Sequence, residues 1–291
     1  MDHVPLDEQT MVVFGATSGI GRATALLAVE RGARVLATGR DESALETLAS
    51  EAGGDVLETR VAEAADPDAV AEVAAAAVGR FGRIDTWAHV AGVAEYARFE
   101  DMTVDEFRRV IDVDLLGPVW GARAALPHLR VRGGAFVVVS SEVAKRGFPL
   151  ASSYSAAKHG VDGFVEALRV ELRHDDVPVS VTQIMPEAVS TPFFEHARTR
   201  LGVRPSGPPP VIEPEKVADA ILHAAEHGGR DVAVGAGAKV QLALQRISPR
   251  IMDAFVHLTA FRGQRSDEPK EPGDDALFRA PQGDDRVEGA V

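Results

Sequence analysis

Cysteine and asparagine are both absent from this chain of 291 residues, and aromatic residues make up only 5% of it. The absence of cysteine excludes disulfide bonds and thiolate chemistry. No apolar run approaches the ~18 residues that a membrane-spanning helix needs. Basic residues are outnumbered, 31 against 44 acidic ones, and the net charge of -13 disfavours nucleic acid and anionic membranes as general partners. The first ten residues combine acidic side chains with no apolar stretch, so we expect no signal peptide and a cytoplasmic location.

Short apolar segments alternate with helix-forming segments between residues 10 and 235. The expected strands are Thr10–Gly15, Ala33–Thr38, Asp55–Val61, Ile84–Val90, Gly134–Ser140, Val177–Met185 and Asp231–Gly235. The expected helices are Ile20–Glu30, Asp41–Ala52, Pro67–Arg80, Val104–Leu129, Tyr154–Arg173 and Pro214–His227, with Asp41 or Ser43 and Thr103 as N-caps. This alternation is typical of parallel βαβ units, and apolar strands fit a sheet covered on both faces. We therefore predict an α/β fold, a Rossmann-type doubly wound parallel sheet in a single domain with a C-terminal extension.

The extension contains two segments of different composition. Residues 239–262 carry apolar residues at helical spacing, broken by Pro249, and three roles are open: a lid, a subunit contact or a membrane-surface contact. The membrane-surface role stays open because this segment has four basic residues and a single acid, Asp253. Residues 263–291 are polar and rich in Pro, Gly, Asp and Glu, which predicts a flexible tail. The Pro-rich segment Leu201–Pro214 is expected to be a loop.

A glycine-rich turn joins the first expected strand to the first expected helix. Gly15 lets the chain leave the strand, Gly19 lets the backbone approach a pyrophosphate, and Gly21 allows close helix–strand packing. The N–H groups and dipole at the start of the helix attract phosphate. A tight turn without a ligand would need the same glycines, but its position at the start of a βαβ series favours a dinucleotide site.

The GxxxGxG spacing of this turn resembles the short-chain dehydrogenase/reductase family, whose usual form is TGxxxGxG. Phe14 stands where the family usually has Thr. The resemblance runs from about Thr10 to Gly235, with further motifs in the family's order. It implies that residues 1–238 form an NAD(P)-binding domain with the catalytic site built in. Further cofactor contacts implied in the turn are Thr17, Ser18 and Ile20.

The second expected strand leads into Gly39-Arg40, where NAD sites commonly place an acid against the ribose 2′-hydroxyl. A carboxylate would repel a 2′-phosphate, whereas an arginine can bind one through two hydrogen bonds. Arg40 therefore favours NADP(H) over NAD, although NAD stays possible. An exposed Arg40 that pairs with Asp41 or Glu42 is the alternative interpretation.

Tyr154 and Lys158 are four residues apart on an expected helix, so they share one face. A phenol with a pKa near 10 is a poor acid–base catalyst at neutral pH, and a neighbouring ammonium lowers that pKa. The pair can then deliver a proton to a carbonyl that receives a hydride. With only two tyrosines and five lysines in the chain, a chance match to this spacing is less easily obtained.

The family resemblance assigns roles to residues after the fifth and sixth strands. Ser141, thirteen residues before Tyr154, would hydrogen-bond the substrate oxygen, with Ser140 as the fallback. Pro186 would pack near the nicotinamide and Thr191 would bind its carboxamide, in a segment where Glu187 replaces the usual Gly.

Three positions depart from the family pattern. The family's NNAG is His89-Val90-Ala91-Gly92 here, and Ala91 and Gly92 keep their implied cofactor contacts. His89 is interpreted as a packed histidine rather than a catalyst. Asp114 replaces the Asn whose backbone anchors a proton-relay water, and it adds a negative charge near Lys158. Glu63 replaces the Asp that contacts the adenine.

These residues predict an NADP(H)-dependent oxidoreductase that transfers a hydride between nicotinamide and a small-molecule carbonyl or alcohol, with Tyr154 as general acid/base. The alternative is a catalytically silent, dinucleotide-sensing binding protein on the same scaffold. We expect no metal site, because no set of residues has ligand spacing. The resemblance also implies a homodimer or homotetramer formed through the two long helices, Val104–Leu129 and Tyr154–Arg173.

Overall fold

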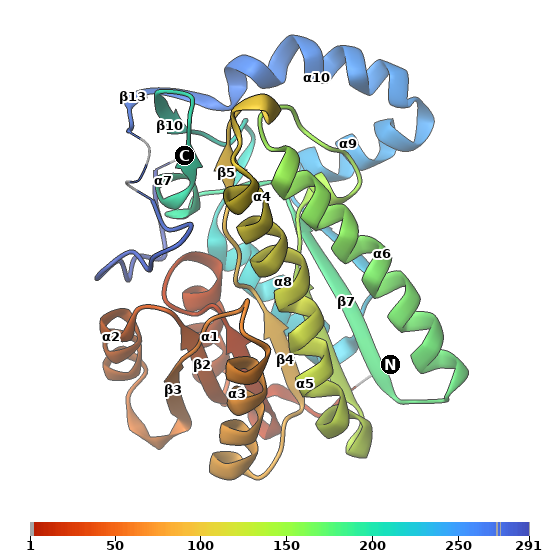
Figure 1. Cartoon of the computed structure of the whole chain (residues 1–291). Helices are drawn as coiled ribbons and strands as arrows, with labels where there is room; N and C mark the ends of the chain where they lie inside the picture. Colours follow the sequence, from red (N-terminus) through yellow and green to blue (C-terminus); the bar gives the residue numbers. More distant parts are fainter. Residues whose placement is uncertain (1–2, 272, 274, 291) are drawn as a thin grey trace.

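The computed structural model describes residues 3–271, 273 and 275–290. Its centre is a seven-stranded, entirely parallel sheet of strand order β12-β7-β6-β4-β1-β2-β3 (Figure 1). The strands are β1 (Thr10–Phe14), β2 (Arg34–Gly39), β3 (Leu57–Val61), β4 (Thr86–His89), β6 (Gly134–Val139), β7 (Val179–Pro186) and β12 (Asp231–Val234). The strand order reverses between β1 and β4, which is the point where doubly wound sheets bind ligands. The predicted fold class is therefore confirmed.

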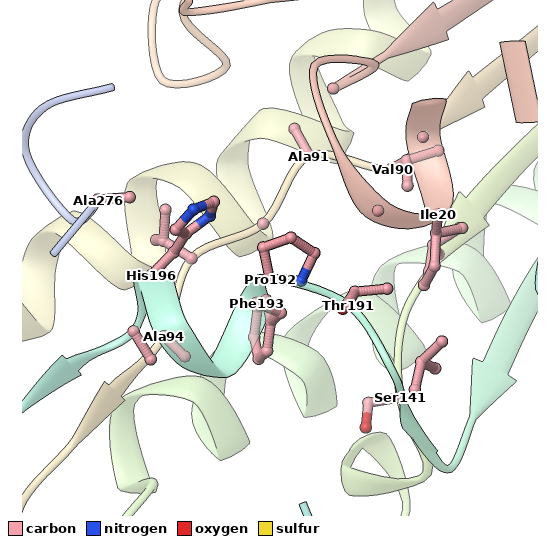
Figure 2. Close-up of a pocket in the computed structure, with 18 of the residues that line it drawn as sticks. Ile20, Val90, Ala91, Ala94, Ser141, Thr191, Pro192, Phe193, His196 and Ala276 are labelled. Atoms are coloured by element: carbon pink, nitrogen blue, oxygen red, sulfur yellow. The ribbon is translucent and has the colours of Figure 1, made fainter. Parts of the chain in front are cut away.

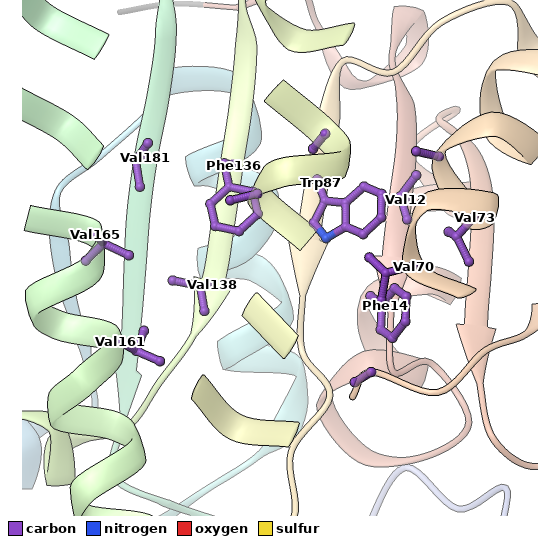
Figure 3. Packing of buried hydrophobic residues seen from close by; sticks show 14 of the residues in the cluster. Val12, Phe14, Val70, Val73, Trp87, Phe136, Val138, Val161, Val165 and Val181 are labelled. Atoms are coloured by element: carbon purple, nitrogen blue, oxygen red, sulfur yellow. The ribbon is translucent and has the colours of Figure 1, made fainter. Parts of the chain in front are cut away.

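Helices cover both faces of the sheet. One face carries α1 (Gly19–Glu30), α2 (Glu42–Ala52) and α8 (Pro214–His227). The other carries α3 (Pro67–Phe81), α4 (Val104–Ile111), α5 (Gly117–Arg132) and α6 (Ser152–His174). Figure 3 shows the second face, where Phe14, Trp87 and Phe136 on the strands pack between valines of α3 and α6. Because consecutive strand residues point to opposite faces, fully apolar strands such as β6 contribute to both cores.

The expected N-caps are confirmed. The side chain of Asp41 accepts the Ser43 N–H at 3.0 Å at the start of α2. Thr103 and Glu106 form a reciprocal capping box at the start of α4, with the Thr103 hydroxyl accepting the Glu106 N–H at 3.2 Å. These local bonds satisfy N–H groups that the first turn of a helix leaves without partners.

The predicted long helix Val104–Leu129 is helical throughout in the structure, but it is not one regular α-helix. Between α4 and α5 lies a wide turn of π-helix, η4 (Asp112–Leu116), in which the Gly117 N–H bonds the carbonyl of Asp112 five residues earlier. Pro118 has no N–H to donate to the carbonyl of Asp114, so regular α-helical bonding cannot continue here. The break places the buried side chain of Asp114 beside the central strands.

Several short elements lie at the carboxyl edge of the sheet. They are β5 (Glu95–Tyr96), η5 (Glu142–Ala144), β8 (Ala188–Val189), α7 (Phe193–His196), β9 (Arg198–Thr199), β10 (Val203–Pro205), β11 (Val211–Ile212) and β13 (Arg265–Pro269). Two of them, β10 and β11, fall in the segment 201–214 that we expected to be a loop, because each pairs with a strand distant in sequence. Residues 239–262 fall in α9 (Ala236–Ile247) and α10 (Pro249–Gly263), which meet at Pro249. Across the described residues, no helix combines the length and the apolar character needed to cross a bilayer.

Candidate functional site

A cavity of about 260 Å³ lies at the carboxyl edge of the central strands, beside the reversal of strand order (Figure 2). Every residue proposed from the sequence for the site lines it, except Asp114: Gly15, Thr17, Ser18, Gly19, Ile20, Gly21, Arg40, Glu63, Ala91, Gly92, Ser141, Tyr154, Lys158, Pro186 and Thr191. The fold thus brings residues from seven separate segments to one place.

The glycine turn has the geometry of a phosphate cradle. Gly15 has a φ of +96°, and a Cβ there would lie 2.5 Å from the backbone nitrogen of Ala91. A Cβ at Gly21 would overlap the carbonyl oxygen of Gly15. Both positions therefore require glycine. Ser18, the N-cap of α1, makes no side-chain hydrogen bond to the helix, so its side chain leaves the helix N–H groups to other acceptors.

Arg40 lies at one end of the cavity with a polar atom that lacks a partner. Its Nη1 is buried without a hydrogen bond, and its Nη2 donates to the carbonyl of Ala276 at 2.6 Å. A buried N–H without an acceptor is costly, and an anionic oxygen would relieve that cost. Burial lowers the pKa of Arg40, Glu63 opposes this and Arg109 adds to it.

Arg109 is a second cation at this end, and the sequence did not single it out. Its Nη2 donates to Glu63 at 2.6 Å, and Glu63 lies 3.8 Å from Arg40 Nη1. Glu63 is therefore held by two guanidinium groups. Arg109 lies near the end of α4, and no spacing in the sequence shows that this turn approaches Glu63, which follows β3.

Tyr154, Lys158 and Ser141 meet at the middle of the cavity. Tyr154 and Lys158 lie on α6, and the Lys158 Nζ is 5.3 Å from the centroid of the phenol ring. Ser141 follows β6, and its Oγ accepts the Val143 N–H at 3.2 Å. Burial raises the pKa of Tyr154 above its ordinary value, Asp114 and Glu142 raise it further, and a hydrogen bond with Ser141 lowers it. The net direction is upward, opposite to the one expected from Lys158 alone.

Burial is the larger cause of that difference, and Asp114 is the second. Its Oδ2 lies 3.2 Å from the Lys158 Nζ, and both side chains are almost completely buried. Its Oδ1 accepts the Val93 N–H at 2.8 Å, and Lys158 also donates to the carbonyl of Val139 at 3.4 Å. The negative charge of Asp114 therefore offsets part of the effect that the Lys158 ammonium has on Tyr154.

Two departures from the family pattern pack against each other. The His89 ring stacks on Phe14, with ring centroids 5.0 Å apart and planes nearly parallel. The Trp87 Nε1 lies 3.5 Å from the His89 Nδ1. Burial, and then the charge of Lys158, lower the pKa of His89 to about 3, so that the ring is neutral at pH 7. Phe14 and His89 therefore replace polar residues as a stacked pair.

Two carboxyl groups on the far wall of the cavity, those of Glu142 and Glu187, have interactions that the sequence did not predict. Glu142 is buried, and burial together with Glu187 raises its pKa to about 7. Glu187 accepts the Ala238 N–H at 2.9 Å and so fixes the start of α9. The rest of this wall is largely apolar, and it includes Val143, Phe148, Ala151, Ala188, Phe193 and Phe194. The arrangement suits an apolar molecule that carries a polar group.

The helical extension contacts this wall. Met252, Val256 and Ala260 on α10 are buried together, with Phe148 packed against them. Gln264, which follows α10 and lines the cavity, donates to the carbonyl of Pro149 at 3.0 Å. The other large apolar side chains of α9 and α10 are mostly exposed, including Val240, Leu244, Ile247, Ile251, Phe255 and Leu258.

Residues 275–290, which we name the C-terminal strap, lie along the cofactor end of the cavity, and Ala276 and Pro281 line it. The Arg286 carbonyl accepts the Gly19 N–H at 2.9 Å. The Gly283 N–H donates to Asp41 at 2.6 Å, and the Gly289 N–H donates to the carbonyl of Ser190 at 3.2 Å. Two of the donors that a dinucleotide would need, the Gly19 N–H and the Arg40 Nη2, are therefore bonded to carbonyls of the strap.

The strap differs from the flexible tail predicted by composition. Leu277 is buried in the main core, and its carbonyl accepts the Arg109 Nε at 2.9 Å. Asp284 pairs with His196 at 2.8 Å, and Arg286 pairs with Glu195 at 2.8 Å. A polar segment can therefore be ordered by main-chain bonds and ion pairs to a preformed surface, which apolar content does not reveal.

Comparison with known proteins agrees with this geometry. The family model of the short chain dehydrogenases matches residues 9–202. The chain is 38% identical over 282 residues to the uncharacterised oxidoreductase YxnA of Bacillus subtilis, a match that covers 94% of this chain and 79% of that one. It is 34% identical over 201 residues to a 3beta-hydroxysteroid dehydrogenase of Mediterraneibacter gnavus, covering 68% and 72% of the two chains. A solved short-chain dehydrogenase from Streptomyces avermitilis superposes with a TM-score of 0.73 at 29% identity, over 88% and 97% of the chains.

The chain therefore belongs to the short-chain dehydrogenase/reductase family. It is an oxidoreductase that acts on a CH–OH or C=O group with NAD(P). Among the described residues, no group of three or more His, Cys, Asp or Glu side chains is arranged to hold a metal ion.

Proposed function

We propose that this protein is an NADP(H)-dependent oxidoreductase that transfers a hydride between nicotinamide and a small-molecule carbonyl or alcohol. The observation that supports this most is the meeting of Ser141, Tyr154 and Lys158 in a cavity that also contains the glycine cradle and Arg40. A protein that only senses a dinucleotide has no need of that trio.

The position of each residue in the cavity supports a separate role in binding or proton transfer. The bound dinucleotide supplies or accepts the hydride. The Ser141 hydroxyl orients the substrate oxygen, and Tyr154 donates a proton to that oxygen during reduction or removes one during oxidation. Lys158 holds the nicotinamide ribose, while Pro186 and Thr191 position the nicotinamide. The start of α1 binds the pyrophosphate through its N–H groups.

The preference for NADP(H) over NAD rests on Arg40. Its Nη1, which makes no hydrogen bond although Glu63 lies 3.8 Å away, is a free donor at the adenosine end of the cavity, and the nearby Arg109 adds positive charge. A 2′-phosphate would accept hydrogen bonds there, and a 2′-hydroxyl would gain less. Binding titrations with NADPH and NADH separately, followed by a panel of ketones and aldehydes, test both parts of the proposal.

The alternative of a silent sensor is favoured by one set of observations, the replacement of the family's Asn residues by His89 and Asp114. The stacking of His89 on Phe14 restores packing there, and the main-chain carbonyl of residue 114 is available with Asp as with Asn. We therefore favour the enzyme. Tight binding of NADPH without turnover of any carbonyl would support the sensor instead.

We also propose a homodimer or homotetramer that pairs through α4, α5 and α6, as the family resemblance implies. For residues 239–262 we propose a lid at the substrate end, since α10 packs on Phe148 at the cavity wall. Deletion of residues 239–291 tests both roles, because a lid affects turnover and a subunit contact affects the mass in solution. Liposome sedimentation of the same variant tests the membrane-surface role.

Shortening the strap is expected to tighten NADPH binding. A chain that ends at Gln282 keeps Leu277 in the core but loses the Arg286 carbonyl on Gly19 and the Gly283 N–H on Asp41. Removing the Arg286 carbonyl frees the Gly19 N–H for the dinucleotide, which should lower the Kd by up to about tenfold. Titration of NADPH fluorescence measures this.

Gly289→Ala gives a test of the strap without truncation. A Cβ at Gly289 would lie 2.4 Å from the backbone nitrogen of Pro192, so the end of the strap must lift. We expect the Kd for NADPH to fall in this variant too, by less than in the truncated chain. Weaker binding in either variant would mean that the strap holds the dinucleotide instead of competing with it.

A further inference from the structure

The carboxylate of Asp114 and the ammonium of Lys158 form a buried pair at the centre of the site. The atoms Oδ2 and Nζ are 3.2 Å apart, and the two side chains are 0% and 4% exposed. The second carboxylate oxygen accepts the Val93 N–H, and the ammonium has a second acceptor in the Val139 carbonyl. The Oδ2 atom itself accepts no hydrogen bond, so its contact with Lys158 is an ion pair flanked by the bonds at Oδ1 and at the Val139 carbonyl. Burial raises the pKa of Asp114 above its ordinary value, and Lys158, the Val93 N–H and Arg109 oppose this rise only in part.

The local chain fixes Asp114 in this place. The η4 turn positions its side chain inward, and Pro118 prevents the regular helix that the sequence would otherwise form. Gly92 lies against the carboxylate, and a Cβ there would approach Oδ2 to 3.3 Å. Asp114 is therefore completely buried, with its carboxylate beside Lys158 and close to the backbone of Gly92.

Other ionisable groups face this pair and the phenol of Tyr154. Glu142 on η5 raises the pKa of Tyr154, and Tyr96 on β5 interacts with the same phenol. His89 on β4 faces Lys158 and is neutral, and Arg109 on α4 acts on Asp114. Among these, Asp114 is the one in direct contact with the lysine on which the acidity of Tyr154 depends.

We propose that Asp114 is a positioning residue that keeps the proton on Tyr154. Its carboxylate compensates the Lys158 ammonium, so the phenol is not drawn toward phenolate at neutral pH. The centre then acts as a proton donor for carbonyl reduction, and the reverse oxidation requires more alkaline conditions. This inference rests on the proposed role of Tyr154 as the acid–base group. It adds that the site favours proton donation at neutral pH, and so carbonyl reduction.

The chain permits a direct test, because it contains only two tyrosines. In a Tyr96→Phe background, tyrosinate absorbance reports Tyr154 alone. Asp114→Asn in that background removes the charge and keeps an oxygen for the Val93 N–H. The Lys158 ammonium lies 5.3 Å from the centroid of the Tyr154 ring, and an opposite charge at about this distance lowers a pKa by about one to three units. Once Asp114 no longer offsets that ammonium, we expect the Tyr154 titration to move down by at least about one unit. Circular dichroism at each pH confirms that the fold is intact.

Asp112→Asn is the matched control, because it removes the same charge from the same η4 turn at a half-buried residue, whereas Asp114 is the carboxylate paired with Lys158. It should leave the titration unchanged. If Asp114→Asn fails to fold, Asp114→Ser removes the charge with a smaller side chain. An unchanged or raised Tyr154 titration in a folded Asp114 variant would overturn the proposal. The titration needs neither cofactor nor substrate, so its outcome is separate from whether the protein turns over a carbonyl.

Discussion

Tyr154→Phe is expected to abolish turnover and to leave dinucleotide affinity unchanged. The phenylalanine ring preserves the packing against Phe193, whose centroid lies 5.9 Å away, while the transferable proton is lost. General acid–base groups contribute on the order of a hundredfold to ten-thousandfold, so the loss should fall in that range. Nicotinamide absorbance during turnover and NADPH fluorescence in titration give the two measurements.

Lys158→Ala gives the comparison that separates the two roles on this helix. Its ammonium is proposed to hold the nicotinamide ribose, so this variant should weaken both binding and turnover. A Tyr154→Phe enzyme that retains turnover within about threefold of the parent would remove Tyr154 from the catalytic centre. A Lys158→Ala enzyme that changes turnover alone would remove the ribose contact.

Arg40→Asp is expected to shift the preference from NADP toward NAD. The substitution removes the buried unpartnered Nη1 and places a carboxylate where a 2′-phosphate would lie. A charge-assisted phosphate contact is worth ~1.5–3 kcal/mol, so NADP affinity should fall by about ten- to a hundredfold. Separate titrations with NADPH and NADH measure the change.

Arg108→Asp is the matched control for Arg40→Asp. Arg108 is exposed on α4 and makes only a long ion pair with Asp105, so the same change of charge occurs outside the cavity. NADP affinity should stay at the parental value in this variant. Equal NADP affinity before and after the Arg40 substitution would refute the phosphate contact.

The α/β fold was predictable because hydrophobic periodicity and glycine positions are local signals. β1, the glycine turn and α1 follow one another within about twenty residues, and each has its own signature. The π-helical turn inside the long helix was not predicted, for the opposite reason. The apolar pattern of this helix continues through Asp112–Leu116. A single proline, Pro118, is a weaker signal than that pattern, so the sequence does not show that the preceding turn widens.

The candidate site was predictable where motifs carry it and was missed where only tertiary contact does. Ser141, Tyr154 and Lys158 have a characteristic order and spacing. Arg109 and the C-terminal strap have none, because their role arises from ion pairs and main-chain bonds with residues more than forty positions away. The pairing of Asp114 with Lys158 was foreseen only as a nearby charge, and the structure turns it into a direct contact.

A single-turnover experiment tests the central claim most directly. Enzyme in excess over NADPH is mixed with a panel of ketones and aldehydes, and the absorbance of the reduced nicotinamide is followed in the parent and in Tyr154→Phe. We predict stoichiometric loss of that absorbance with at least one carbonyl in the parent, and a loss at least about a hundredfold slower in the variant, although both bind NADPH. Tight binding of NADPH by the parent without oxidation by any carbonyl would contradict it.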